Sequence, residues 1–121
     1  MKTRWTFRAL RTNSGNVVDD WLAQNTGLRA RVDSYLRRLR EMDPPWPFPY
    51  YRSLGDGVGE IRMDYGRVEH RLYGFFGLLP RQFTVLIASS DKKRQRQLIQ
   101  EAKKLKKRVE NSNSATEEYL V

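Results

Sequence analysis

Arginine, histidine and tyrosine side chains gather in the stretch GEIRMDYGRVEHRLYGFF, which spans residues 59–76. Arg62 and Arg71 carry guanidinium groups that stay charged and bind phosphate through two parallel donors. His70 is the only histidine of the chain, and an ordinary histidine pKa of about 6.5 suits proton transfer near neutral pH. Tyr73 offers a ring that can orient or stack against an unpaired base. Together these groups suit chemistry at a phosphodiester backbone.

The stretch is predicted to form two antiparallel strands joined by a turn at Tyr65-Gly66-Arg67. Successive side chains of a strand point to opposite faces of the sheet. If helices cover only the apolar face of the hairpin, Arg62, Arg71 and Tyr73 share the opposite, open face. His70 then lies at the margin of the core side, near the turn. A simpler interpretation stays open, in which Arg62 pairs with a neighbouring glutamate and His70 is structural.

Hydrophobic periodicity in the rest of the chain predicts an α+β frame for this hairpin. The expected elements are a strand over 4–10, helices over 17–25 and 28–40, antiparallel strands over 58–64, 68–76 and 82–88, and a helix over 93–110. The segment Asp43–Pro49 holds four of the five prolines, and we expect a stiff connector in which Trp46 and Phe48 cover an edge of the core.

We therefore predict one small α+β domain over residues 1–110. It would have an N-terminal strand, two helices, a three-stranded antiparallel meander and a C-terminal helix. Residues 111–121 are polar and lack periodicity, so we expect a flexible tail there.

The charge of the chain is one-sided, with 23 Lys and Arg against 14 Asp and Glu and a net charge of +9. Such an excess attracts nucleic acid, an anionic membrane surface or an acidic protein. A well-solvated basic protein without such a partner is the simpler alternative. The excess is densest over residues 92–108, which hold nine basic residues and one acid, Glu101. Because like charges repel, this density favours a polyanion, although a solvated amphipathic helix is the default interpretation.

Several classes of site are excluded by composition. There is no cysteine, so disulfides and thiolate metal sites are excluded, and one histidine without clustered carboxylates gives no credible metal site. No apolar run approaches the roughly 18 residues of a membrane helix, and the first residues lack the apolar block of a secretory signal. We expect a soluble cytoplasmic protein.

Three short motifs, in this order, carry a resemblance to a known family: LGDGVGEIR (54–62), HRLYGFF (70–76) and VLIASSDKK (85–93). They resemble segments of the RelE/ParE superfamily of toxins, especially its phage-type HigB-like subgroup, and the order of elements matches over about residues 3–110. The resemblance implies a toxin of a type II toxin–antitoxin pair, held inactive by a cognate antitoxin. Most RelE-like members cut mRNA on the ribosome, whereas ParE-like members inhibit DNA gyrase.

The resemblance also implies roles for particular residues. Arg71 matches the arginine that RNase members place at the scissile phosphate, and Arg62 matches the arginine of the preceding strand. Lys92 and Lys93 match a basic turn before the last helix. His70 is then the candidate general base, and Lys, Tyr or Asp91 takes this role if His70 faces the core. The catalytic candidates are Arg62, His70, Arg71, Tyr73, Lys92 and Lys93, and the further RNA-binding candidates are Arg52, Arg67, Arg94 and Arg96.

The expected function is that of a ribosome-dependent, metal-independent mRNA endonuclease (mRNA interferase). Its expected partners are a cognate antitoxin and mRNA on the ribosome, with no membrane and no small-molecule cofactor. Leu98 and Ile99 occupy the region where RNase relatives carry Tyr or His. This departure favours two alternatives, a ParE-like non-catalytic inhibitor of DNA gyrase and an inactive nucleic-acid-binding relative.

Overall fold

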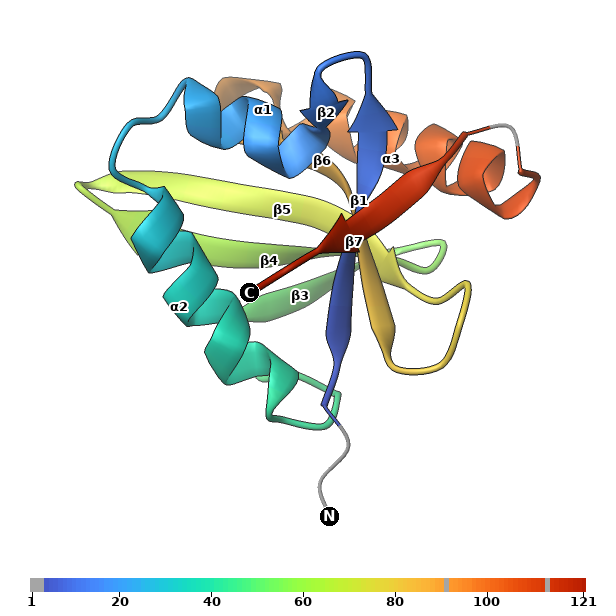
Figure 1. The fold of residues 1–121 in the computed structure, drawn as a ribbon, viewed down its shortest axis with the longest axis horizontal. Helices are drawn as coiled ribbons and strands as arrows, with labels where there is room; N and C mark the ends of the chain where they lie inside the picture. The colour runs from blue at the N-terminus through green and yellow to red at the C-terminus, as the bar shows by residue number, and fades with distance from the viewer. Residues whose placement is uncertain (1–3, 91, 113) are drawn as a thin grey trace.

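The computed structural model describes residues 4–90, 92–112 and 114–121 (Figure 1). These residues form a mixed α+β fold with a seven-stranded sheet and three α-helices. In chain order the elements are β1 (Thr6–Thr12), β2 (Gly15–Asn16), α1 (Val17–Ala23), α2 (Arg29–Arg40), β3 (Tyr51–Gly55), β4 (Val58–Tyr65), β5 (Val68–Phe76), β6 (Gln82–Ser89), the short 3₁₀ helix η1 (Lys92–Arg94), α3 (Gln95–Glu110) and β7 (Thr116–Tyr119).

The strands lie in the order β2-β1-β6-β5-β4-β3, and β7 pairs with β1. The β3, β4, β5 and β6 strands are antiparallel neighbours. In contrast, β1 runs parallel to β6, with Thr6 opposite Gln82 and Ala9 opposite Val85. The sheet is therefore mixed, and its first strand lies between strands from much later in the chain.

The predicted architecture of one N-terminal strand plus a three-stranded meander is wrong, because the sheet of the described residues has seven strands. The two-residue strand β2 is too short to give a periodic pattern. Strand β3 begins directly after the proline-rich connector and adds an edge to the meander. Strand β7 lies in the predicted flexible tail, where Tyr119 is 5% exposed and the backbone pairs with β1.

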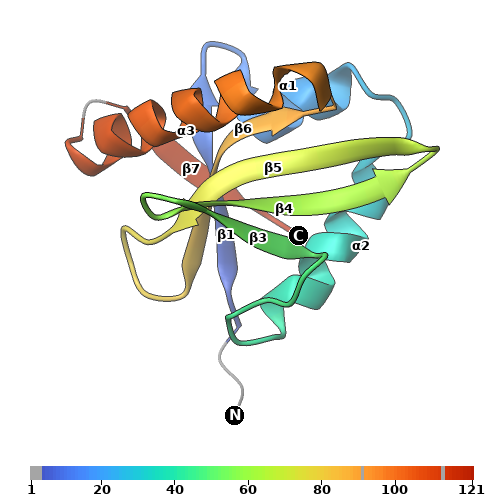
Figure 2. The same cartoon turned by 180° about the vertical axis from the view of Figure 1, so that it is seen from behind.

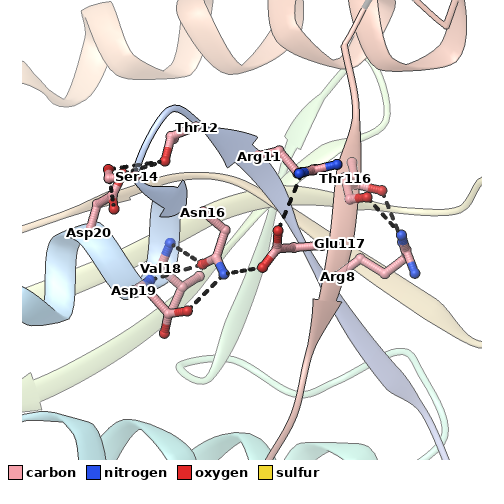
Figure 3. A network of polar contacts seen from close by, with 10 residues as sticks. All are labelled: Arg8, Arg11, Thr12, Ser14, Asn16, Val18, Asp19, Asp20, Thr116 and Glu117. Carbon is pink, nitrogen blue, oxygen red and sulfur yellow. Dashed lines mark hydrogen bonds and ion pairs between the residues drawn. The ribbon is translucent and has the colours of Figure 1, made fainter.

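Polar side chains fasten β7 to the first strand and to the start of α1 (Figure 3). The side-chain oxygen of Asn16 caps α1 by accepting hydrogen bonds from the backbone of Val18 and Asp19, at 3.0 and 2.9 Å. The amide nitrogen of Asn16 donates to Glu117 at 3.0 Å. Arg8 donates to the hydroxyl oxygen of Thr116 at 2.9 Å. These long-range contacts explain why a polar segment without periodicity forms a strand.

Helices cover both faces of the sheet, so the predicted open face is also wrong. Helices α1 and α2 pack over the main core, which includes Leu36, Ile61 and Leu72. Helix α3 lies on the other side, as Figures 1 and 2 show from opposite directions. There Leu98 and Ala102 pack against Val58 and Tyr73, a set we call the α3 cluster. The apolar stripe of α3 predicts a packed helix but does not say which face of the sheet it covers.

The connector between α2 and β3 is anchored by one aromatic residue and exposes another. Trp46 is 2% exposed, packs against Phe76 with ring centroids 5.0 Å apart, and donates its indole N–H to the carbonyl of Met42 at 2.9 Å. Phe48 is 71% exposed. The expectation that both rings cover the core is therefore right for Trp46 and wrong for Phe48.

Candidate functional site

The register of β4 and β5 brings together several of the residues singled out in the sequence. Arg62 lies directly opposite Arg71, and Glu60 lies opposite Tyr73. Because side chains at paired positions share a face of the sheet, these four residues point to the α3 side. Three of them are almost fully buried: Tyr73 at 0%, Glu60 at 2% and Arg71 at 5% exposure.

Arg71 is held by carboxylates on both sides. Its Nε lies 3.2 Å from Oε2 of Glu60, and its Nη2 contacts the carboxylate of Glu69. The other oxygen of Glu60 lies 2.9 Å from Nη2 of Arg52. A buried charge needs such partners, since leaving one unpaired is costly. Arg71 is therefore built into an ion-pair network instead of facing solvent as a free phosphate ligand, and Arg52 belongs to the same network.

Glu69 lies where several positive charges meet. The hydrogen bond from Arg71 holds the pKa of Glu69 below its ordinary value against the opposing effect of burial, and the charges of Lys92 and Arg62 lower this pKa further. Lys92 reaches this region because β6 pairs with β5 at Ser89 and Arg71, so the chain leaves the sheet nearby. We call Arg62, Glu69, Arg71 and Lys92 the β4–β5 cluster.

Arg62 is the half-buried cation of this cluster. Within the described part of the chain, no carboxylate forms a salt bridge with it. Its guanidinium carbon lies 5.8 Å from the centre of the Phe48 ring. Its backbone N–H donates to the carbonyl of Tyr50 at 3.0 Å. Arg62 therefore combines a fixed backbone with a side chain that can contact an anion.

His70 points to the opposite face and is 5% exposed. Its Nδ1 lies 2.7 Å from the hydroxyl of Ser90, which also accepts the indole N–H of Trp21 at 3.0 Å. Burial lowers the pKa of His70, although a backbone hydrogen bond at Tyr65 and the charge of Asp64 act in the other direction. The structure thus gives His70 a place in the α1 side of the core and does not bring it to the β4–β5 cluster.

Tyr73 is fully buried in the α3 cluster. Its hydroxyl has no hydrogen-bond partner among the described residues. Burial, followed by the charge of Glu60, raises the pKa of Tyr73 to about 12. A ring in this position cannot stack on a base, so the sequence-based role for Tyr73 does not fit its surroundings.

The remaining basic candidates lie around the cluster or farther along the surface. Arg67 sits in the turn between β4 and β5 with a positive φ of 67° and is exposed. Lys93 and Arg94 are exposed in η1, and Arg96 is exposed in the first turn of α3. Asp91 lies outside the described residues. The structure therefore brings Lys92 to the cluster and places Lys93, Arg94 and Arg96 on the adjoining surface.

Two carboxylates are the functional candidates that sequence reasoning missed. Glu60 and Glu69 occupy the same face as Arg62 and Arg71, and the alternation of the strands contains that information. The alternation does not show that α3 buries this face. Burial is what holds the neighbouring charged side chains in a fixed network.

Neither a metal centre nor a membrane span is found in residues 4–90, 92–112 and 114–121. No group of three or more His, Cys, Asp or Glu side chains in this part could hold a metal ion. No helix within it has the length and apolar character needed to cross a membrane.

Comparison of the chain with family models, curated proteins and solved structures gives no match in any of the three. The resemblance to the RelE/ParE superfamily stays a prediction from three sequence motifs. The functional interpretation therefore depends on the β4–β5 cluster and the basic surface next to it.

Proposed function

We propose that this chain is the toxin of a type II toxin–antitoxin pair and acts in the cytoplasm as a ribosome-dependent, metal-independent mRNA endonuclease. A cognate antitoxin holds it inactive. The observation that carries the proposal is that Arg71 contacts the carboxylate of Glu69 while the charges of Arg62 and Lys92 also act on it, beside the basic helix η1. Metal-free cleavage of RNA needs a proton acceptor, a proton donor and cations that stabilise the charged phosphorus, and a carboxylate among cationic side chains can supply them.

The reaction assigns one task to each group. The 2′-hydroxyl attacks the neighbouring phosphorus, forming an O2′–P bond while the P–O5′ bond breaks, and a 2′,3′-cyclic phosphate and a 5′-hydroxyl result. Glu69 is ionised at neutral pH and accepts the proton of the 2′-hydroxyl. The Lys92 ammonium donates a proton to the leaving 5′-oxygen. Arg62 stabilises the negative charge of the pentavalent phosphorus.

Arg71 acts as a positioning residue in this proposal. Its buried guanidinium joins Glu60 to Glu69 and fixes the direction of the Glu69 carboxylate. The resemblance implies a different role for Arg71, in which its guanidinium binds the scissile phosphate. The positioning role follows from burial, since the guanidinium is enclosed and already paired.

Primer extension on a defined transcript, in cells that express the chain alone, tests the proposal. Discrete cuts within translated codons are expected for the wild type. Glu69→Gln should slow cutting about 10²–10⁴-fold, and Arg62→Ala about 10²–10³-fold. The matched controls are Glu118→Gln and Arg37→Ala, which change exposed residues on β7 and α2. Cutting at the wild-type rate by both cluster variants contradicts the proposal.

A second candidate function is supported by the same geometry. His70 and Tyr73 are buried and Arg71 already forms ion pairs with two carboxylates, which fits a non-catalytic protein that inhibits DNA gyrase or binds nucleic acid without cutting it. Growth arrest with intact transcripts and with gyrase covalently attached to cleaved DNA would favour the gyrase inhibitor. Binding of nucleic acid without growth arrest would favour the inactive relative.

A further inference from the structure

We propose that Phe48 and Arg62 form a seat for one unpaired nucleobase, next to the β4–β5 cluster. The proposal deepens the proposed function, because it takes RNA as the ligand and adds a base contact to a site argued only from backbone chemistry. It gives a role to Phe48, which lies outside the three sequence motifs and outside the ion-pair network of Arg71.

Phe48 is an aromatic ring presented to solvent at 71% exposure. A lone exposed apolar residue is common, but this ring has a charged neighbour of a particular kind. The guanidinium carbon of Arg62 lies 5.8 Å from the ring centre, within the range in which a cation and an aromatic face attract each other. Aromatic rings and arginine planes are the surfaces on which proteins stack unpaired bases.

The ring of Phe48 is held on an anchored support. Trp46, two residues earlier, is 2% exposed and hydrogen-bonded to Met42. The backbone N–H groups of Tyr50 and Tyr51 both donate to the carbonyl of Pro47, at 2.9 and 3.2 Å. The backbone that carries Phe48 is therefore fixed before a base binds, so less conformational entropy is lost on binding.

Arg62 links this seat to the β4–β5 cluster. Its backbone is bonded to the connector at Tyr50, and across the sheet it lies opposite Arg71. Because the guanidinium carbon of Arg62 lies 5.8 Å from the centre of the Phe48 ring, a phosphate bound by Arg62 and a base on Phe48 would belong to the same nucleotide or to neighbouring ones. The seat would give the protein a contact that depends on the presence of a base, which phosphate contacts cannot provide.

The test measures binding of a fluorescein-labelled six-nucleotide RNA whose 2′-O-methyl groups prevent cleavage, by fluorescence anisotropy. Phe48→Ala and Phe48→Leu should bind about 10-fold more weakly than the wild type, while Phe48→Trp should bind at least as well. The dependence of affinity on salt should stay the same in all variants, because phosphate contacts set it. Leu79→Ala, which changes another exposed apolar residue at 63% exposure, is the matched control and should bind normally.

A second set of probes locates the contact. Replacing single nucleotides by abasic ones should weaken wild-type binding about 10-fold at one position and have no such effect in Phe48→Leu. Normal binding by Phe48→Leu, or equal sensitivity of both proteins to every abasic site, overturns the seat. So does the absence of any binding by the wild type.

The seat and the proposed function can fail separately. Transcript cutting that needs Glu69 but not Phe48, together with normal RNA binding by Phe48→Leu, overturns the seat alone. Base-dependent binding through Phe48 without cutting keeps the seat and overturns the endonuclease. Because Phe48 is exposed, its variants should unfold at the wild-type temperature, which a thermal scan checks.

Discussion

The two faces of the β4–β5 hairpin show how one pair of strands can serve two purposes. Toward α1 and α2 the hairpin presents Ile61 and Leu72, which join one large apolar core, together with the buried His70. Toward α3 it presents the Glu60–Arg71 ion pair beside the small α3 cluster. Because successive residues of a strand face opposite sides of the sheet, the side chains of the large apolar core lie on one face and the buried charged side chains on the other. The first face is therefore stabilised by apolar packing, and the second holds the buried ion pair on which the proposed endonuclease depends.

The largest expected effect comes from breaking the ion pair on the α3 face. Glu60→Ala removes a partner of both Arg52 and Arg71, and Arg71 is buried. We expect the free energy of unfolding to fall by up to about 3–5 kcal/mol, because the buried guanidinium of Arg71 loses the carboxylate at its Nε and keeps only Glu69 as a partner. Urea denaturation followed by circular dichroism measures it.

The control for this prediction removes both buried charges. Glu60→Ala combined with Arg71→Met should recover much of the lost stability, since both buried charges are then gone and the partners left behind, Arg52 and Glu69, reach solvent. A Glu60→Ala protein as stable as the wild type would mean that the network has no structural role. The α3 face would then be an ordinary charged surface, and the contrast between the two faces would be lost.

A smaller, pH-dependent effect is expected on the other face. His70→Gln removes the imidazole contact with Ser90, which should cost about 1 kcal/mol at pH 7. Burial lowers the pKa of His70 in the folded state, so the unfolded chain binds the proton first as the pH falls. The stability from the neutral histidine is complete above its ordinary pKa of about 6.5 and is lost as the pH falls through that value toward the folded pKa.

Denaturation curves at pH 7.5 and at pH 5.5 measure this effect. The wild type should lose more stability between the two values than His70→Gln does. RNA cutting should be little changed by His70→Gln at neutral pH, because His70 lies on the face away from Glu69. If His70→Gln stays folded but loses as much cutting activity as Glu69→Gln, His70 takes part in the reaction.

The smallest expected effect lies at the edge of the α3 face. Lys103 of α3 lies 3.2 Å from the carboxylate of Asp56, which is largely exposed. Exposed pairs of this kind contribute about 0–1 kcal/mol. Lys103→Ala should therefore change the free energy of unfolding by less than about 1 kcal/mol in the same urea experiment, in contrast to Glu60→Ala. An effect of equal size for the two variants would show that burial is not what distinguishes the network.

Local sequence patterns predict part of this structure well. Period-two alternation places Arg62, Arg71 and Tyr73 on one face, and the apolar stripes predict α2 and α3. The same patterns contain no information on which face of the sheet α3 covers. For that reason the predicted open face is wrong, and Tyr73 is a core residue.

The parts that sequence patterns miss depend on contacts between distant residues. Strand β7 has the sequence TEEY, which lacks a clear apolar pattern, and its position depends on partners such as Asn16 and Arg8. The placement of His70 depends on Trp21 and Ser90, which lie far from it in the chain. Exposure of Phe48 follows from the way the connector turns after Trp46. None of these contacts leaves a periodic signal.

The position of β1 has a consequence for how the protein is made. Its hydrogen-bonding neighbours are β6 on one side and β2 and β7 on the other, so Phe7 is paired with both Phe83 and Tyr119. Strand β1 leaves the ribosome before β6 and β7, so it stays unpaired on these sides until both later strands have been synthesised. Contacts between such distant residues slow folding, and the sheet can close only after β6 and β7 have been synthesised. A nascent chain halted before residue 82 would lack the strand against which β1 packs, and it would expose the apolar side of a strand that the finished protein keeps inside.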